Sequence, residues 1–120
     1  VTTTATEDDA TEDTAANLAL LRRLSDDRLR LGGLPDHLPE AGLIVDALLG
    51  IGVTGDLREP IASLAAWANE RRETGTKVLA VDVPSGLDAD TGAAADGTVR
   101  ADLTVAMGAL KAGLLVGDGP

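Results

Sequence analysis

Two almost unbroken apolar stretches stand in the second half of the chain. Residues 43–48 read LIVDAL and residues 78–83 read VLAVDV, and one aspartate interrupts each run. Runs of this kind are typical of strands that are buried on both faces of a parallel sheet. A third apolar segment, at residues 103–107, predicts another strand. We therefore expect these three segments to be the strands of a parallel sheet.

Helical spacing of apolar residues appears before and between these runs. Residues 12–24 place leucines three and four apart, follow a cap at Thr11 or Asp13 and end near two arginines, which predicts a helix. A second helix is predicted over residues 60–72, with Pro60 at its first position. Its apolar stripe consists of Ile61, Leu64, Ala65 and Ala68. A strand, a helix and a strand in this order predict a right-handed crossover and an α/β fold.

Each of the two apolar runs carries an aspartate near its end. Asp46 precedes the glycine-rich segment GIGVTGD, and Asp82 precedes the turn PSG. In an open α/β sheet, ligands bind beyond the carboxyl ends of the strands. A buried carboxylate costs free energy unless it is paired, hydrogen-bonded or bound to a cation. One such residue would be read as a backbone cap, but two of them beside glycine-rich turns indicate a binding site.

The segment at residues 50–55 formally matches G-x-G-x-x-G, the dinucleotide fingerprint. In that fingerprint the third glycine lies in the first helical turn, whereas here residues 56–59 separate it from the predicted helix. We therefore expect a wider loop whose backbone N–H groups surround part of a ligand. Oxygen atoms of Asp46 and Ser85 would suit a hard cation, and the residue types alone leave potassium, sodium and calcium open.

The composition of the chain excludes several classes of function. The chain has 120 residues, enough for one domain, and a formal net charge of −10. It has no cysteine, which excludes disulfides, cysteine-bound zinc and a thiol nucleophile. A pI near 4.3 argues against nucleic-acid binding, and no apolar run is long enough to span a membrane. Only Lys77 and Lys111 are lysines among ten cations. An acidic, lysine-poor chain indicates either a halophilic organism or a GC-rich genome.

Three phrases, in this order, carry a specific resemblance. VDALLGIGVTGDLREPI, VLAVDVPSGLDADTG and VRADLTVAMGALKAGLL are similar to segments of the NAD(P)H-hydrate epimerase family, also called the YjeF N-terminal domain. The resemblance implies a Rossmann-like parallel sheet sandwiched by helices, with residues 1–120 forming the C-terminal part of that domain. The family carries an upstream Asn-Asn-Gly-Gly-Asp-Gly loop that this sequence lacks. The site is thus expected to be incomplete here, and the isolated fragment inactive.

The resemblance implies an isomerase that interconverts the R and S epimers of hydrated NADH and NADPH. It also implies a potassium ion bound by Asp46 and Ser85. The residues expected to line the hydrated cofactor are Gly50, Ile51, Gly52, Val53, Thr54, Gly55, Asp56 and Asp82. Removal and return of the C6 hydroxyl, or opening and closing of the ring, needs a group that takes up and gives back a proton. Asp82 is our candidate, with binding of the ribose or amide as its alternative role.

Further expectations concern the cellular setting. The resemblance implies a cytoplasmic role in metabolite repair, fusion to an ADP/ATP-dependent NAD(P)H-hydrate dehydratase domain, and a homodimer. Two other functions stay open at this point. One is an NAD-dependent Rossmann oxidoreductase, against which the long glycine-rich loop counts. The other is a non-catalytic module of the same fold that binds a nucleotide or a protein, against which the retention of Asp46, Asp82 and Ser85 counts.

Overall fold

The computed structural model describes residues 11–24, 40–52 and 54–119, so Val53 lies outside the described residues. The chain divides into two compact units, residues 1–39 and 40–120. In chain order the elements are α1 (Glu12–Arg23), β1 (Leu43–Asp46), α2 (Ile61–Glu73), β2 (Lys77–Val81), β3 (Leu103–Val105) and the 3₁₀ helix η1 (Ala112–Leu114). None of the helices within the described ranges is long and apolar enough to cross a bilayer.

Helix α1 confirms the prediction for residues 12–24. The Thr11 hydroxyl caps it and accepts a hydrogen bond from the Thr14 N–H at 3.3 Å. Acidic residues lie in its first turn and two arginines in its last, which complements the helix dipole. Its sequence and caps therefore suffice to explain where it begins and ends.

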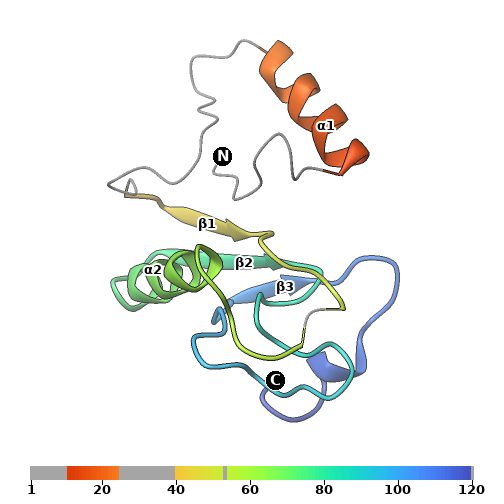
Figure 1. The fold of residues 1–120 in the computed structure, drawn as a ribbon. Coiled ribbons are helices and arrows are strands. Elements are labelled where there is room, and N and C mark those ends of the chain that lie inside the picture. Colours follow the sequence, from red (N-terminus) through yellow and green to blue (C-terminus); the bar gives the residue numbers. More distant parts are fainter. Residues whose placement is uncertain (1–10, 25–39, 53, 120) are drawn as a thin grey trace. The chain divides into compact units, whose positions relative to one another are not determined.

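The three strands form one parallel sheet in the order β1-β2-β3 (Figure 1). Leu43 pairs with Lys77 at the start of β1, and Leu79 pairs with Leu103 at the start of β3. Helix α2 connects β1 to β2 and packs against the sheet. The predicted α/β fold with a parallel sheet is confirmed, and its geometry brings the carboxyl ends of all three strands to one edge.

The core lies between α2 and one face of the sheet. Leu64, Ala65 and Ala68 of the helix are buried, as are Val78 and Ala80 of β2. Because side chains alternate along a strand, Lys77, Leu79 and Val81 face the other way. The stripe predicted for α2 is therefore the face that makes the core.

The opposite face of the sheet differs from the sequence prediction. Strands buried on both faces were expected, yet Leu43, Val45, Leu103 and Val105 are about half exposed. The reason is that, within residues 40–119, α2 is the one helix that packs on the sheet, and it covers the other face. A helix layer on the second face stays a prediction.

All three strands end earlier than predicted, and for β1 and β2 the reason is local. β1 ends at Asp46, whose Oδ1 accepts the Leu48 N–H at 3.3 Å and turns the chain. β2 ends at Val81 because Asp82 has a φ of 73°, in the left-handed region that a strand cannot use. Pro60 is the N-cap of α2 rather than its first residue. Both aspartates therefore lie where the sheet gives way to loops.

Candidate functional site

Asp46 and Ser85 meet at the carboxyl edge of the sheet, on the face covered by α2. Asp46 is 3% exposed and Ser85 is fully buried. The Ser85 hydroxyl donates to Asp46 Oδ1 at 2.6 Å, and the Ser85 N–H donates to Oδ2 at 2.8 Å. Ser85 Oγ in turn accepts the Leu49 N–H at 3.0 Å. This network ties the turn after β1 to the turn after β2.

The same pair fits a hard cation in part. Hydroxyl and carboxylate oxygens lie side by side, and Asp46 Oδ2 accepts one hydrogen bond, which leaves it a lone pair. No lysine or arginine within the described ranges lies within salt-bridge distance of this buried carboxylate. The described residues hold no group of three or more histidine, cysteine or acidic side chains arranged for a metal. Further ligands would have to be neutral oxygens.

Asp82 lies in a second, separate cluster at the same edge. Its backbone N–H donates to the Val105 carbonyl at 2.8 Å, which joins the end of β2 to the end of β3. Its Oδ1 accepts the Met107 N–H at 3.0 Å and also a hydrogen bond from Lys111 Nζ. Lys111 Nζ donates to the Met107 carbonyl as well, at 2.7 Å. Asp82, Met107 and Lys111 therefore form a closed hydrogen-bonded ring.

This ring sets the charge of Asp82. The hydrogen bond from Lys111 and then that from the Met107 N–H hold the pKa of the Asp82 carboxyl below its ordinary value of 3.8. Both donors bind Oδ1, and no group in the described part of the chain donates to Oδ2. Asp82 is thus an ionised carboxylate at neutral pH with one oxygen uncommitted. Such an oxygen can accept a proton from a ligand.

The glycine-rich loop lies opposite the turn after β2. A cavity of about 240 Å³ separates them, and its lining consists of Thr54, Gly55, Asp56, Gly86, Asp88, Ala93, Ala94 and Ala95. Gly52 and Gly55 have φ values of 92° and 84°, which only glycine adopts without strain. Residues 56–60 separate Gly55 from the start of α2, so this loop does not form the dinucleotide fingerprint. Three of the residues expected to line the hydrated cofactor, Thr54, Gly55 and Asp56, line this cavity, whereas Gly50, Ile51, Gly52 and Asp82 do not.

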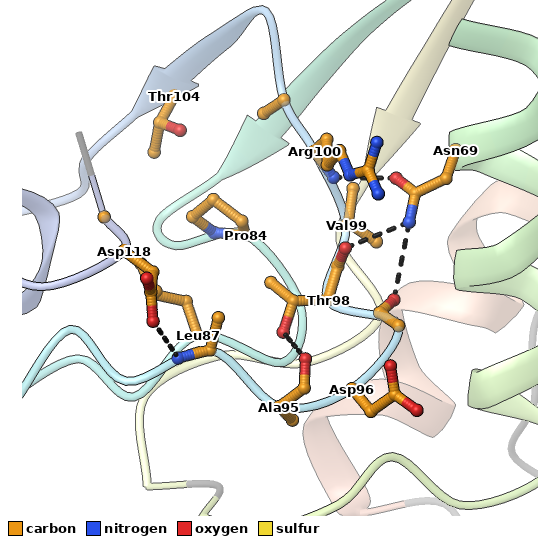
Figure 2. A pocket seen from close by; sticks show the side chains of 14 residues that line it. Asn69, Pro84, Leu87, Ala95, Asp96, Thr98, Val99, Arg100, Thr104 and Asp118 are labelled. Carbon is orange, nitrogen blue, oxygen red and sulfur yellow. Dashed lines mark hydrogen bonds between the residues drawn. The ribbon is translucent and has the colours of Figure 1, made fainter. Parts of the chain in front are cut away.

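A larger cavity of about 540 Å³ lies on the other side of this turn, beside β3 (Figure 2). Figure 2 shows Asn69 of α2 reaching the segment that contains Thr98 and Arg100. Asn69 donates to the Thr98 carbonyl at 3.0 Å and accepts the Arg100 N–H at 2.8 Å. Thr98 Oγ1 is also engaged, since it donates to the Ala95 carbonyl at 2.7 Å. These polar groups hold the loop before β3 in place, which is a structural role.

The family model described as YjeF-related protein N-terminus matches residues 1–113. The chain belongs to this family. The match includes all three strands, both aspartates, Ser85 and Lys111.

Curated relatives of this YjeF-related chain carry consistent names. A bifunctional NAD(P)H-hydrate repair enzyme Nnr from Salinibacter ruber is 48% identical over 94% of this chain and 23% of its own length. An NAD(P)H-hydrate epimerase from Cenarchaeum symbiosum is 38% identical over 87% of this chain and 47% of its own length. An NAD(P)H-hydrate epimerase from Microbacterium testaceum is 48% identical over 65% of this chain. The chain thus spans less than half the length of these relatives.

Sequence reasoning about this YjeF-related chain missed Lys111 and Asp88. Lys111 had a signal, because it is one of two lysines in an arginine-rich chain and follows the third strand. Asp88 lines the smaller cavity, and its Oδ1 accepts the N–H groups of Asp90 and Thr91 at 3.0 and 2.8 Å. The Thr91 N–H above all holds the pKa of Asp88 below its ordinary value. Its contacts identify it as the residue that shapes this turn.

Proposed function

We propose that the complete protein interconverts the R and S epimers of hydrated NADH and NADPH, as an NAD(P)H-hydrate epimerase. One observation carries this proposal: the glycine-rich loop and the turn after β2 enclose a cavity at the carboxyl edge of a parallel sheet. That edge is where α/β folds bind ligands. The names of the relatives from Salinibacter ruber, Cenarchaeum symbiosum and Microbacterium testaceum support the same activity.

The proposed chemistry needs one group that takes a proton and returns it. C6 of the hydrate bears a hydroxyl and is bonded to the ring nitrogen. Asp82 Oδ2 would take the hydroxyl proton, C6 would become a carbonyl, and the C6–N bond electrons would move to the nitrogen. The nitrogen then attacks the other carbonyl face while Asp82 returns the proton to the oxygen. No atom is gained or lost, and an ionised carboxylate is suited to the first step.

We also propose a potassium ion beside this site. Asp46 and Ser85 would provide a carboxylate and a hydroxyl ligand, which are hard oxygen donors. When bound, the ion would supply positive charge to an edge that also holds Asp56 and Asp88. Asp46 Oδ2 is the atom that retains a lone pair for it. Asp46 would then hold the ion, and Asp82 would transfer the proton.

Fusion to an ADP/ATP-dependent dehydratase is a further proposal. It is supported by the bifunctional name of the Salinibacter ruber relative and by the small share of that relative that this chain spans. The homodimer and the cytoplasmic location stay predictions.

The test follows the two epimers over time after the complete protein is added to one purified epimer. We expect conversion to an equilibrium mixture without any change in the redox state of the nicotinamide. An Asp46→Asn variant should be slower and should regain rate as potassium rises, because occupancy follows mass action. An Asp56→Asn variant is the matched control: Asp56 lines the cavity, so its loss should also slow conversion, but rising potassium should not restore the rate because Asp56 lies outside the proposed ion site.

Two outcomes would favour the other functions. Hydride transfer to or from intact NAD, seen as a change in nicotinamide absorbance, would favour an oxidoreductase. Binding of the hydrate without conversion would favour a non-catalytic module. Potassium dependence that is equal in wild type and Asp46→Asn would contradict the assignment of Asp46 to the ion.

A further inference from the structure

Lys111 occupies an unusual environment for a lysine in this chain. Its side chain is 15% exposed, whereas that of Lys77, the second lysine, is 72% exposed. Lysine is rarely buried unless it is paired, because its ammonium group loses hydration. Lys111 Nζ compensates by donating to Asp82 Oδ1 and to the Met107 carbonyl. Such an arrangement commits the ammonium group to one position.

The backbone around Lys111 is anchored so that this position is fixed. η1 starts one residue later, and the Leu114 N–H donates to the Lys111 carbonyl at 3.1 Å. The buried Gly113 donates its N–H to the Ala89 carbonyl at 2.7 Å. A Cβ at Gly113 would collide with the Asp88 carbonyl oxygen, so only glycine allows this approach. The turn after β2 therefore holds the segment that carries Lys111.

Both groups that donate to the Asp82 carboxylate bind the same oxygen, so its two oxygens have different surroundings. The Met107 N–H and Lys111 Nζ both occupy Oδ1 and so fix the rotation of the carboxylate. Oδ2 then has one orientation and no donor among the described residues. Lys111 is also the one charged group in the described ranges within salt-bridge distance of Asp82. Lys111 thus helps to orient the Asp82 carboxylate and also supplies its counter-charge.

We propose that Lys111 is a positioning residue of the catalytic site, which holds the Asp82 carboxylate by its Oδ1 and so directs Oδ2 toward the substrate. This inference rests on the proposed epimerase function and gives that function a second residue. A purely structural ion pair would differ, because its loss would lower the melting temperature without changing the pH dependence of kcat. The proposal therefore predicts an effect on turnover that exceeds any effect on folding.

The experiment compares Lys111→Met, Lys111→Arg and Lys77→Met in the complete protein. We expect Lys111→Met to lower kcat by roughly 10- to 100-fold with little change in KM, by analogy with the loss of residues that orient metal ligands. The acid limb of its kcat profile should move to higher pH, because loss of Lys111 raises the pKa of Asp82. Lys111→Arg should restore part of the rate, and Lys77→Met should match wild type.

Three results would overturn this inference. One is a Lys111→Met variant with wild-type kcat and an unchanged pH profile. A second is a rate loss equal in Lys111→Met and Lys111→Arg that follows a fall in melting temperature. The third is an unchanged titration midpoint of the Asp82 carboxyl, measured by NMR, in Lys111→Met relative to wild type. This measurement does not need epimerase activity. It therefore tests the pairing of Lys111 with Asp82 even if wild type does not interconvert the epimers, an outcome that would contradict the proposed function itself.

Discussion

The described part of the chain contains two Lys–Asp pairs, and they lie at opposite ends of the same sheet. At the amino end, Lys77 Nζ contacts Asp102 Oδ1 at 3.3 Å, and Asp102 Oδ2 accepts the Val78 N–H at 2.9 Å. At the carboxyl end, Lys111 contacts Asp82, which also accepts a backbone N–H from Met107. Both pairs thus combine a lysine, an aspartate and one main-chain donor.

The pairs differ in how the carboxylate uses its oxygens. Asp102 has a donor on each oxygen, and Arg72 adds a further contact to Oδ1 at 3.4 Å. Asp82 receives both donors on Oδ1. Asp102 therefore braces β2 against β3, whereas Asp82 keeps one oxygen that has no donor among the described residues. Under the proposed function, the distribution of donors distinguishes the structural pair from the functional pair, and the residue types do not.

Replacing each aspartate by asparagine should give the largest contrast. Asp82→Asn in the complete protein should lose about 10²- to 10⁴-fold in epimerisation rate, because an amide cannot take up the proton. Asp102→Asn should keep the rate and lower the melting temperature, since its ionic contacts are lost. Epimer interconversion and thermal unfolding measure the two effects. Near wild-type turnover in Asp82→Asn would reduce Asp82 to a binding residue.

Replacing one glycine near each Lys–Asp pair should give the next largest difference in turnover. In Gly113→Ala the new methyl group meets the backbone of residues 88–89, and overpacking of this kind costs about 1–3 kcal/mol. The shift should also displace Lys111 and slow turnover. Gly42→Ala is the control, because a Cβ there meets no atom within 4 Å. Equal rates in the two variants would show that the anchoring of Lys111 does not matter.

Acid should weaken the brace at the amino end. The Val78 N–H above all holds the pKa of Asp102 below its ordinary value of 3.8. A lowered folded-state pKa means that the carboxylate stabilises the fold above about pH 4 and that this stability is lost as the pH falls. Urea unfolding from about pH 5 to about pH 3 should therefore show a smaller loss in Asp102→Asn than in wild type. Parallel curves would contradict a stabilising role for Asp102.

Salt should give the smallest effect and should act on the whole chain. With a net charge of −10, self-repulsion should decrease as KCl rises, since the Debye length falls to about 3 Å at 1 M. The melting temperature should rise in KCl and also in NaCl, although the exposed Lys77–Asp102 contact is screened. A flat response would favour the GC-rich genome over a halophilic origin as the source of this composition.

Much of the fold could be predicted because it depends on local patterns. The apolar runs gave the three strands, and the spacing of Leu64, Ala65 and Ala68 gave the helix face. Strand ends could not be predicted, because a hydrogen bond at Asp46 and a positive φ at Asp82 decide them. Both are properties of the folded backbone.

The candidate site was predictable for a different reason. Residues at the carboxyl ends of parallel strands must gather at one edge, so Asp46, Ser85 and Asp82 could be placed together in advance. Their division into two clusters could not, because it depends on which donor each carboxylate meets. Lys111 follows Asp82 after a long loop, β3 and a turn, and only the folded path of this segment brings it back. Contacts between distant segments are thus what the sequence pattern leaves out.

The left-handed backbone of Asp82 limits which residues can replace it. With a φ of 73°, only glycine, asparagine and aspartate fit without appreciable strain. A library selected for folding alone should therefore accept three residues at position 82, and a library selected for activity should accept one. The difference between the two sets separates the needs of the main chain from those of the reaction.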